Sequence, residues 1–277
     1  MTFRRPVRGS VSTRRSSVPV RRGPTIRRSS AGSGRTRAVA LLVLVLSGLA
    51  IYGAGASSAF GYRRLDLAAV TYTDELSVRA ELGISDGTNL FVLATDGIAE
   101  RLRRLPAVTG ATIEVVLPDT IRIRLAERRP ILVWTVGERR LLLDRDRVAF
   151  AQAGDAGDLP VVDDRRTSTS ALGVGDVLDP VDFDAATRLA ALRPADLGSG
   201  AAALHVSIDD ERGFALDTGT EGWTAIFGFF TPNLRQTELI QGQVRLLGSL
   251  LAGREEKIAT VILADEKSGT FTLKTTP

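Results

Sequence analysis

The chain begins with a charge-rich tail and an uninterrupted apolar run, which mixed helix and strand patterns follow. The apolar run predicts a membrane span. Residues 38–56 are nineteen uncharged and mostly apolar residues, and the charge-free run continues to Tyr62. At about 1.5 Å per helical residue, nineteen residues extend roughly 28 Å, close to the roughly 30 Å hydrocarbon core of a bilayer. We therefore predict one transmembrane helix over 38–56, with Phe60 and Tyr62 in the interfacial aromatic belt.

A mixed pattern follows up to residue 130. Residues 65–71 are typical of a short strand, and residues 96–105 have the apolar spacing of a helix that ends before a proline. Strict alternation over 113–117 and 121–125, with a Pro-Asp turn between them, predicts a hairpin with one buried face. The predicted order over this segment is β-α-α-β-β, in which two helices cover one face of a three-stranded sheet.

The segment of the first of these helices fits two patterns. Asp74 places an acidic residue where a helix would begin, and Leu76, Ala80 and Ile84 follow at four-residue intervals as its predicted buried face. Alternating apolar residues in the same stretch would also fit a strand. The acidic start favours the helix.

The second half of the chain is predicted to be rich in strands, with two helices. Residues 182–192 form a helix with Phe183, Ala186 and Leu189 inward, and residues 233–251 form a second one. The apolar stripe of that second helix is Ile240, Val244, Leu247 and Leu251. The candidate strands are 131–136, 140–144, 147–150, 204–209, 213–217, 223–227, 258–263 and 269–274. The fold class is α+β, and the expected divisions are a tail (1–37), a span (38–56), a first domain (63–130) and a β domain (131–277).

Charge changes the picture at the amino-terminal end. Residues 1–37 hold eleven arginines and no acidic residue, whereas residues 63–277 carry 25 basic and 32 acidic side chains. The tail has few large apolar residues, so we expect it to be disordered, cytoplasmic and able to contact anionic headgroups. By the positive-inside rule the amino terminus is cytoplasmic and residues 63–277 lie outside. The rival interpretation is a cleaved signal peptide, for which residues 54–56 have the small-x-small form of a cleavage site.

The inventory of reactive side chains predicts a protein that is not an enzyme. The chain has no cysteine and only one histidine, His205, which excludes thiolate catalysis, paired-histidine metal sites and histidine-based triads within it. No phosphate-binding or nucleophile-elbow glycine motif is present, so no cofactor and no metal are expected. His205 is expected to be structural. The acidic residues expected to lie in solvated turns are Asp144, Asp146, Asp163, Asp164, Asp209, Asp210 and Glu211.

An ordered set of short motifs is similar to one known family. The set comprises Gly87-Thr88-Asn89-Leu90-Phe91, Leu105-Pro106-x-Val108, Pro118-x-Thr120-Ile121-x-Ile123, Glu127-Arg128-x-Pro130, Trp134, Leu142-Leu143-Asp144 and Leu159-Pro160. In this order, after a basic tail and one span, they resemble the POTRA domain and β domain of the FtsQ/DivIB bacterial cell-division proteins. The likeness covers roughly residues 36–163, thins over 164–210 and returns at Trp223 and the last helix and strands. It implies a bitopic scaffold at the division septum of the cell membrane, which links early and late division proteins.

The last strand is the candidate partner site. A strand near residues 269–274 could be an unpaired sheet edge, which can accept a partner's strand through main-chain hydrogen bonds. The resemblance implies that this region binds the FtsB-type subunit of an FtsB–FtsL pair, and that the POTRA domain contacts other division proteins. The family usually ends in an apolar-Asp-Leu-Arg strand, whereas this chain has Ile262-Leu263-Ala264-Asp265. The predicted contact residues are Ser268, Gly269, Thr270, Phe271, Thr272, Leu273 and Lys274.

Two other functions remain open from the sequence. One is an exported POTRA-type adaptor or chaperone released by signal-peptide cleavage. The other is an envelope hydrolase that uses a carboxylate pair, for which Asp209 and Asp210 would be the best candidates.

Overall fold

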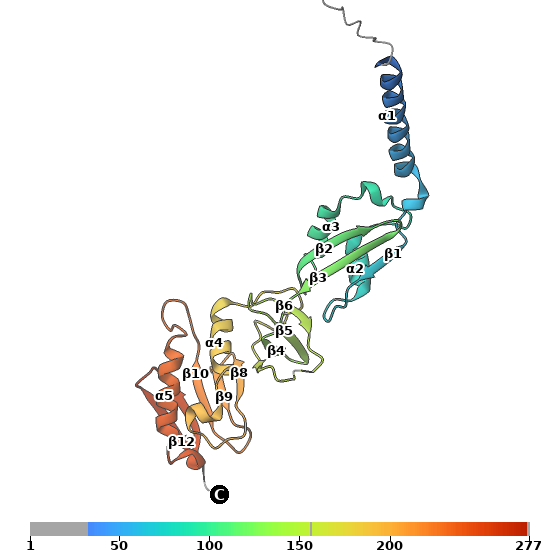
Figure 1. Ribbon diagram of the computed structural model, residues 1–277. Coiled ribbons are helices and arrows are strands. Elements are labelled where there is room, and N and C mark those ends of the chain that lie inside the picture. Colours follow the sequence, from blue (N-terminus) through green and yellow to red (C-terminus); the bar gives the residue numbers. More distant parts are fainter. Residues whose placement is uncertain (1–32, 156, 276–277) are drawn as a thin grey trace, which may run out of the picture. The chain divides into compact units, whose positions relative to one another are not determined.

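The computed structural model describes residues 33–155 and 157–275, beginning with a long apolar helix. This helix, α1 (Ser33–Ala56), contains the twenty-residue segment Gly34–Gly53, which is long and apolar enough to cross a membrane (Figure 1). The first residue of the candidate span lies four residues before that of the predicted span, and its last residue lies three residues before the predicted last residue. Most of the predicted disordered tail lies in residues 1–32, outside the described residues.

The first sheet has the predicted β-α-α-β-β order. Its strand order is β1-β3-β2, with β1 parallel and β2 antiparallel to β3. The two helices pack their buried residues against this sheet in one apolar cluster. The elements are β1 (Arg64–Leu67), α2 (Glu75–Leu82), α3 (Thr95–Leu102), β2 (Val108–Val116) and β3 (Thr120–Glu127), with a 3₁₀ turn at Leu90–Val92.

Helix α2 exists as predicted, but its buried face was predicted wrongly. Val78 and Leu82 are buried in the cluster, whereas Leu76 is 79% exposed. Asp74 caps the helix by accepting a hydrogen bond from the Ser77 backbone N–H, and the helix ends at Gly83 with a φ of 60°. Because the helix stops at Gly83, Ile84 of the predicted stripe lies outside it. Within the helix, Val78 and Leu82 provide a larger apolar face than Leu76 and Ala80.

The second sheet has nine strands in the order β12-β11-β10-β9-β8-β7-β4-β5-β6. It is a mixed sheet, because β4 and β8 each run parallel to β7, and β10 runs parallel to β11. The strands are β4 (Leu132–Val136), β5 (Arg139–Leu143), β6 (Ala149–Gln152), β7 (Val161–Asp164), β8 (His205–Asp209), β9 (Gly213–Asp217), β10 (Thr224–Gly228), β11 (Ile258–Leu263) and β12 (Gly269–Leu273). The predicted strands are confirmed to within a few residues, and β7 was not predicted.

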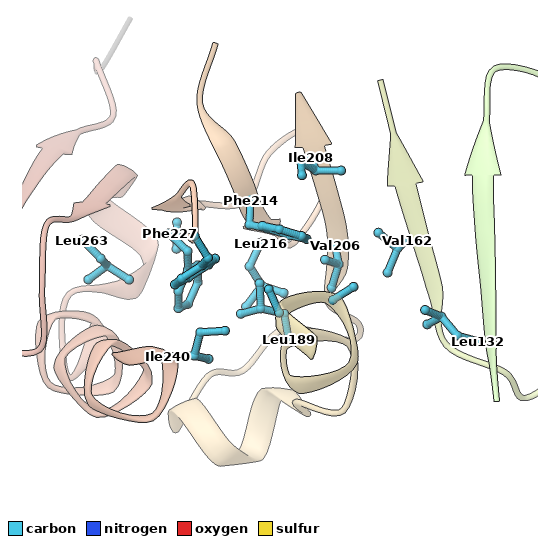
Figure 2. Packing of buried hydrophobic residues seen from close by; sticks show 14 of the residues in the cluster. Leu132, Val162, Leu189, Val206, Ile208, Phe214, Leu216, Phe227, Ile240 and Leu263 are labelled. Atoms are coloured by element: carbon cyan, nitrogen blue, oxygen red, sulfur yellow. The ribbon is translucent and has the colours of Figure 1, made fainter. Parts of the chain in front are cut away.

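Two helices, α4 (Pro180–Ala190) and α5 (Leu239–Leu251), cover one face of this sheet (Figure 2). The buried residues from the helices and the strands form a continuous apolar cluster that includes Leu189, Phe214, Phe227 and Ile240. The predicted stripe of α5 faces this core, but the helix begins at Leu239 rather than at 233.

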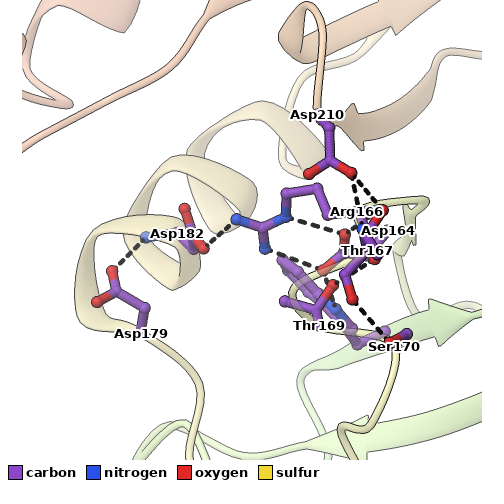
Figure 3. A network of polar contacts seen from close by, with 9 residues as sticks. Asp164, Arg166, Thr167, Thr169, Ser170, Asp179, Asp182 and Asp210 are labelled. Atoms are coloured by element: carbon purple, nitrogen blue, oxygen red, sulfur yellow. Dashed lines mark hydrogen bonds and ion pairs between the residues drawn. The ribbon is translucent and has the colours of Figure 1, made fainter.

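One acidic residue expected in a solvated turn is instead completely buried. Asp164 ends β7, and its carboxylate accepts a hydrogen bond from the Trp134 indole N–H at 3.1 Å. It also accepts one from Arg166 Nη2 at 2.9 Å (Figure 3). Arg166 also donates through Nη1 to Asp182 on α4 at 2.6 Å. The expectation failed because a paired and hydrogen-bonded carboxylate can be buried where an isolated one cannot.

Asp144 was also expected in a solvated turn and is instead buried. It follows β5 and is 5% exposed. Its carboxylate accepts the backbone N–H groups of Asp146 and Val148 at 3.0 Å and pairs with Arg128. Arg128 also donates through Nε to the Pro106 carbonyl at 2.9 Å. These contacts tie the end of the first sheet to the β5–β6 turn. Residues 54–277 form one compact unit that contains both sheets, and the domain boundary near residue 130 stays a prediction.

A candidate partner-binding edge of the large sheet

Strand β12 lies at one end of the nine-stranded sheet, and among residues 33–155 and 157–275 its one strand partner is β11. All five of its residues, Gly269–Leu273, are exposed. Of the seven predicted contact residues, the structure places five in this strand, Ser268 in the turn before it and Lys274 directly after it. The structure therefore brings the predicted residues together on one sheet edge.

Two backbone hydrogen bonds fix which side of β12 faces its neighbour. The Ser268 carbonyl accepts from the Ala264 N–H at 2.9 Å, and the Lys274 N–H donates to the Lys257 carbonyl at 2.8 Å. Backbone groups of successive strand residues point to alternate sides in the plane of the sheet. The even-numbered residues from Ser268 to Lys274 therefore direct their backbone N–H and C=O groups toward β11.

The odd-numbered residues of β12 consequently direct their backbone groups away from the sheet. These are Gly269, Phe271 and Leu273, and no described strand lies on that side. Their N–H and C=O groups form a row that an added strand can pair with, which is the requirement for β-augmentation.

Apolar side chains line both faces of this edge. Phe271 opposes Val261 of β11 on the face covered by α5, and its side chain is 38% exposed. Leu273 on β12 and Ile262 on β11 are 57% and 48% exposed. A partner strand seated on the edge would cover these side chains, and their burial would add to the main-chain hydrogen bonds.

The turn between β11 and β12 is held in a defined shape. Asp265 Oδ1 accepts the backbone N–H groups of Lys267 at 2.7 Å and Ser268 at 2.6 Å, and these bonds hold the pKa of Asp265 below its usual range. Helix α5 approaches this turn so closely that a Cβ at Gly242 would lie 2.3 Å from the Glu266 Cβ. The edge is therefore anchored to the fold at its first residue.

The ends of the parallel pair β10–β11 are closed by two side chains. Gln243 Nε2 donates to the carbonyls of Phe227 at 3.3 Å and Leu263 at 3.0 Å, and Arg235 Nη2 donates to the Leu263 carbonyl at 2.7 Å. Burial lowers the pKa of the Arg235 guanidinium, while the charge of Asp265 opposes that effect. These bonds satisfy carbonyl groups that the strands leave unpaired and so support β11 behind β12.

Lysines flank the same hairpin. The three lysines of the chain are Lys257 before β11, Lys267 in the turn and Lys274 after β12. The Lys274 ammonium donates to the Glu221 carbonyl at 2.6 Å, which fixes the far end of β12. Lysines beside a sheet edge are one of the devices by which proteins limit unwanted edge-to-edge pairing.

Asp209 and Asp210, the candidates for a catalytic carboxylate pair, both accept hydrogen bonds from neighbouring loop residues. Asp209 Oδ1 accepts the backbone N–H groups of Glu211 at 3.0 Å and Arg212 at 2.7 Å. Partial burial would raise the pKa of Asp209, but these bonds and the Arg212 guanidinium lower it. Asp210 accepts from the Thr167 backbone and hydroxyl, as Figure 3 shows. Both carboxylates are thus held in a turn rather than aimed together at a cavity.

His205 begins β8 and is exposed there. Among residues 33–155 and 157–275, no group of three or more His, Cys, Asp or Glu side chains is arranged to hold a metal ion.

Comparison with known proteins supports the family resemblance. The POTRA domain, FtsQ-type, matches residues 63–128. The cell division protein FtsQ of Anaeromyxobacter sp. (strain K) is 31% identical over 218 residues, which cover 72% of this chain and 74% of that protein.

Two further relatives match over a shorter stretch. The cell division protein FtsQ of Mycobacteroides abscessus is 29% identical over 48% of this chain and 44% of its own length. That of Koribacter versatilis is 32% identical over 46% of this chain and 39% of its own length. The chain thus spans less than half the length of these two relatives.

The POTRA match falls on the first sheet, an apolar helix precedes it, and the longest of these alignments extends across most of both proteins. The chain belongs to the FtsQ family of cell division proteins.

Proposed function

We propose that this chain is a membrane-anchored scaffold at the division septum that recruits an FtsB–FtsL-type pair through β12. The span would hold the chain in the cell membrane with its amino terminus in the cytoplasm and residues 63–277 outside. The POTRA domain (63–130) would contact other division proteins of the membrane, and the β domain (131–277) would bind the pair. The scaffold would in this way link early and late components.

The observation that carries the proposal is the free edge of β12. Phe271 and Leu273 direct their backbone groups outward, no described strand pairs with them, and Phe271, Leu273 and Ile262 expose apolar surface beside them. An extended segment of the FtsB-type subunit can add to this edge as a further antiparallel or parallel strand. The outward N–H and C=O groups of this edge would supply the main-chain bonds, and burial of the apolar side chains would add to them.

The test uses a proline that removes one outward N–H group. Phe271→Pro deletes a donor that β11 does not use, and proline is tolerated at such edge positions. The full-length chain, purified in detergent, is titrated with the FtsB–FtsL-type pair of the same bacterium. We expect Phe271→Pro to weaken binding by at least tenfold, and Phe271→Ala to weaken it less because the backbone bonds remain.

The opposite edge of the same sheet supplies a matched control. Strand β6 is the other end of the strand order, and the Ala153 N–H donates to the Arg140 carbonyl, so the neighbouring Gln152 N–H faces outward. Gln152→Pro should therefore leave binding unchanged. Equal affinity of the Phe271→Pro and Gln152→Pro variants, with both folded, would refute a β12 binding edge.

A further inference from the structure

Three large apolar side chains are exposed at one end of the first sheet. Phe91 is 53% exposed, Val92 is 76% exposed and Leu117 is 46% exposed. Phe91 and Val92 belong to the 3₁₀ turn Leu90–Val92, and Leu117 lies in the turn between β2 and β3. None of them is needed for the β12 edge, which lies on the other sheet.

Backbone bonds bring both turns to the point where the chain enters β1. The Tyr62 N–H donates to the Thr88 carbonyl at 2.8 Å, and the Arg63 N–H donates to the Asp119 carbonyl at 2.9 Å. The loop before Phe91 and the turn that carries Leu117 therefore flank residues 62 and 63.

The covalent chain limits the distance between this end of the sheet and the end of the candidate span. The candidate span ends at Gly53, and the Asn89 side-chain amide donates to the carbonyl of Gly55, only two residues later. Two residues extend at most about 7 Å, which is comparable to the thickness of a headgroup layer. The Asn89 side chain also accepts from the Phe91 N–H at 2.9 Å, so Phe91 is held at the same level.

The turn that presents Phe91 and Val92 is built into the fold. Leu90 and Tyr62 are each 3% exposed in the core of the first sheet, and the Phe91 ring packs edge-on against Phe60 with centroids 4.7 Å apart. Tyr62 was expected in the interfacial belt, and its burial corrects that expectation. Because Leu90 is buried and holds the turn in place, Phe91 and Val92 remain exposed on the surface of the domain.

Basic side chains accompany this apolar surface. Arg63 and Arg64 are both exposed at the start of β1, and Arg64 is 72% exposed while it pairs with Asp119 at 3.0 Å. Apolar side chains that insert, next to cations that reach phosphate groups, are the combination that binds an interfacial membrane surface.

We propose that Phe91, Val92 and Leu117 insert into the boundary between headgroups and acyl chains of the membrane from which the chain emerges. The occupant of this surface is lipid, because Asn89 donates to the carbonyl of Gly55, which is only two covalently linked residues beyond the end of the candidate span. The proposal does not depend on the β12 edge or its partner.

The test measures the immersion depth of single spin labels on the full-length chain in vesicles of phosphatidylethanolamine and phosphatidylglycerol. The chain has no cysteine, so each of Phe91→Cys, Val92→Cys and Leu117→Cys provides one attachment point. Oxygen partitions into lipid, whereas a water-soluble nickel chelate stays outside. We expect collisions with oxygen to exceed those with the chelate at positions 91 and 92, which gives a positive depth parameter.

Leu76→Cys is the matched control. Leu76 is 79% exposed on the same domain, but its helix begins beside Glu127 at the opposite end of β3. Its label should show a negative depth parameter, as in water. A negative value at 91 and 92 as well would overturn the proposal. Low collision rates with both reagents, together with broadening from a nearby second label, would show a second copy on this surface and would also overturn it.

Discussion

Arg166 joins the large sheet to helix α4 through two ion pairs. Its guanidinium lies between Asp164 of β7 and Asp182 of α4 at 2.9 and 2.6 Å, and the side chain of Asp164 is completely buried. Burial raises the pKa of Asp182 despite its bond to Arg166. The site therefore holds one cation against two carboxylates, with the Trp134 N–H as a further donor.

Removing that cation is expected to destabilise the fold strongly. Arg166→Met leaves Asp164 buried without its ion-pair partner, and we expect a loss of about 3 kcal/mol in the free energy of unfolding. Urea unfolding of the full-length chain in detergent, followed by tryptophan fluorescence, measures it. Arg165→Met is the control, because Arg165 pairs with Asp163 at the surface and should cost less than about 1 kcal/mol. If both variants lose a similar free energy of unfolding, the burial of the Arg166–Asp164 pair does not account for the destabilisation.

The same residues explain why β7 was not visible in the sequence. Its inward positions are Val162 and Asp164, so only one of the two is apolar, and a four-residue strand offers no longer pattern. A paired, buried carboxylate looks like a solvated one until its partners are known. Helix α4 was easier to predict, because Phe183, Ala186 and Leu189 repeat at helical spacing.

At the scale of elements, Glu127 fastens the loop before α2 to the end of β3. Its carboxylate accepts the backbone N–H groups of Thr71, Tyr72 and Thr73 at 2.7 to 2.9 Å. Partial burial would raise the pKa of Glu127, but these donors outweigh that effect and hold the pKa below its usual range. The ionised form is thus the one that stabilises the folded chain.

This arrangement predicts a pH-dependent contribution to stability. Glu127→Gln should cost about 1 to 2 kcal/mol at pH 7, since the amide offers one accepting oxygen in place of a carboxylate. The difference should be complete above the ordinary Glu pKa of about 4.3 and should vanish as the pH falls through the lower folded-state pKa. Unfolding of the full chain between pH 3 and 7 measures it. Glu114→Gln, at an exposed position on β2, should show no such dependence, and a loss for Glu127→Gln that is independent of pH would contradict the assignment.

The candidate binding strand illustrates how far the sequence reaches at this scale. Alternation of Thr270, Phe271, Thr272 and Leu273 predicts a strand, and the structure has one at Gly269–Leu273. Which backbone groups face outward depends on pairing, and the pairing includes a bulge between Ile258 and Thr260. That bulge leaves no mark in the hydrophobic pattern, so the outward row of donors and acceptors could not be read from it.

At the scale of the whole molecule, the chain combines one apolar helix with a folded unit over residues 54–277. The apolar helix and the order of elements were predicted from apolar runs and periodicity, because these are properties of consecutive residues. The POTRA domain was expected only from the resemblance to a known family. The burial of Tyr62 and the exposed turn at Phe91 depend on contacts between distant segments, which periodicity does not encode. Family membership rests on the POTRA match at 63–128 and on a relative aligned over most of both chains.

The central claim is that this chain acts at the division septum through its folded part. The most direct measurement is the position of a fluorescent protein fused to residue 1 of the full-length chain, in dividing cells of the bacterium that encodes it. We predict a band at mid-cell that disappears when residues 63–277 are removed while the span is kept. A uniform signal around the envelope in cells that are forming septa would contradict the account.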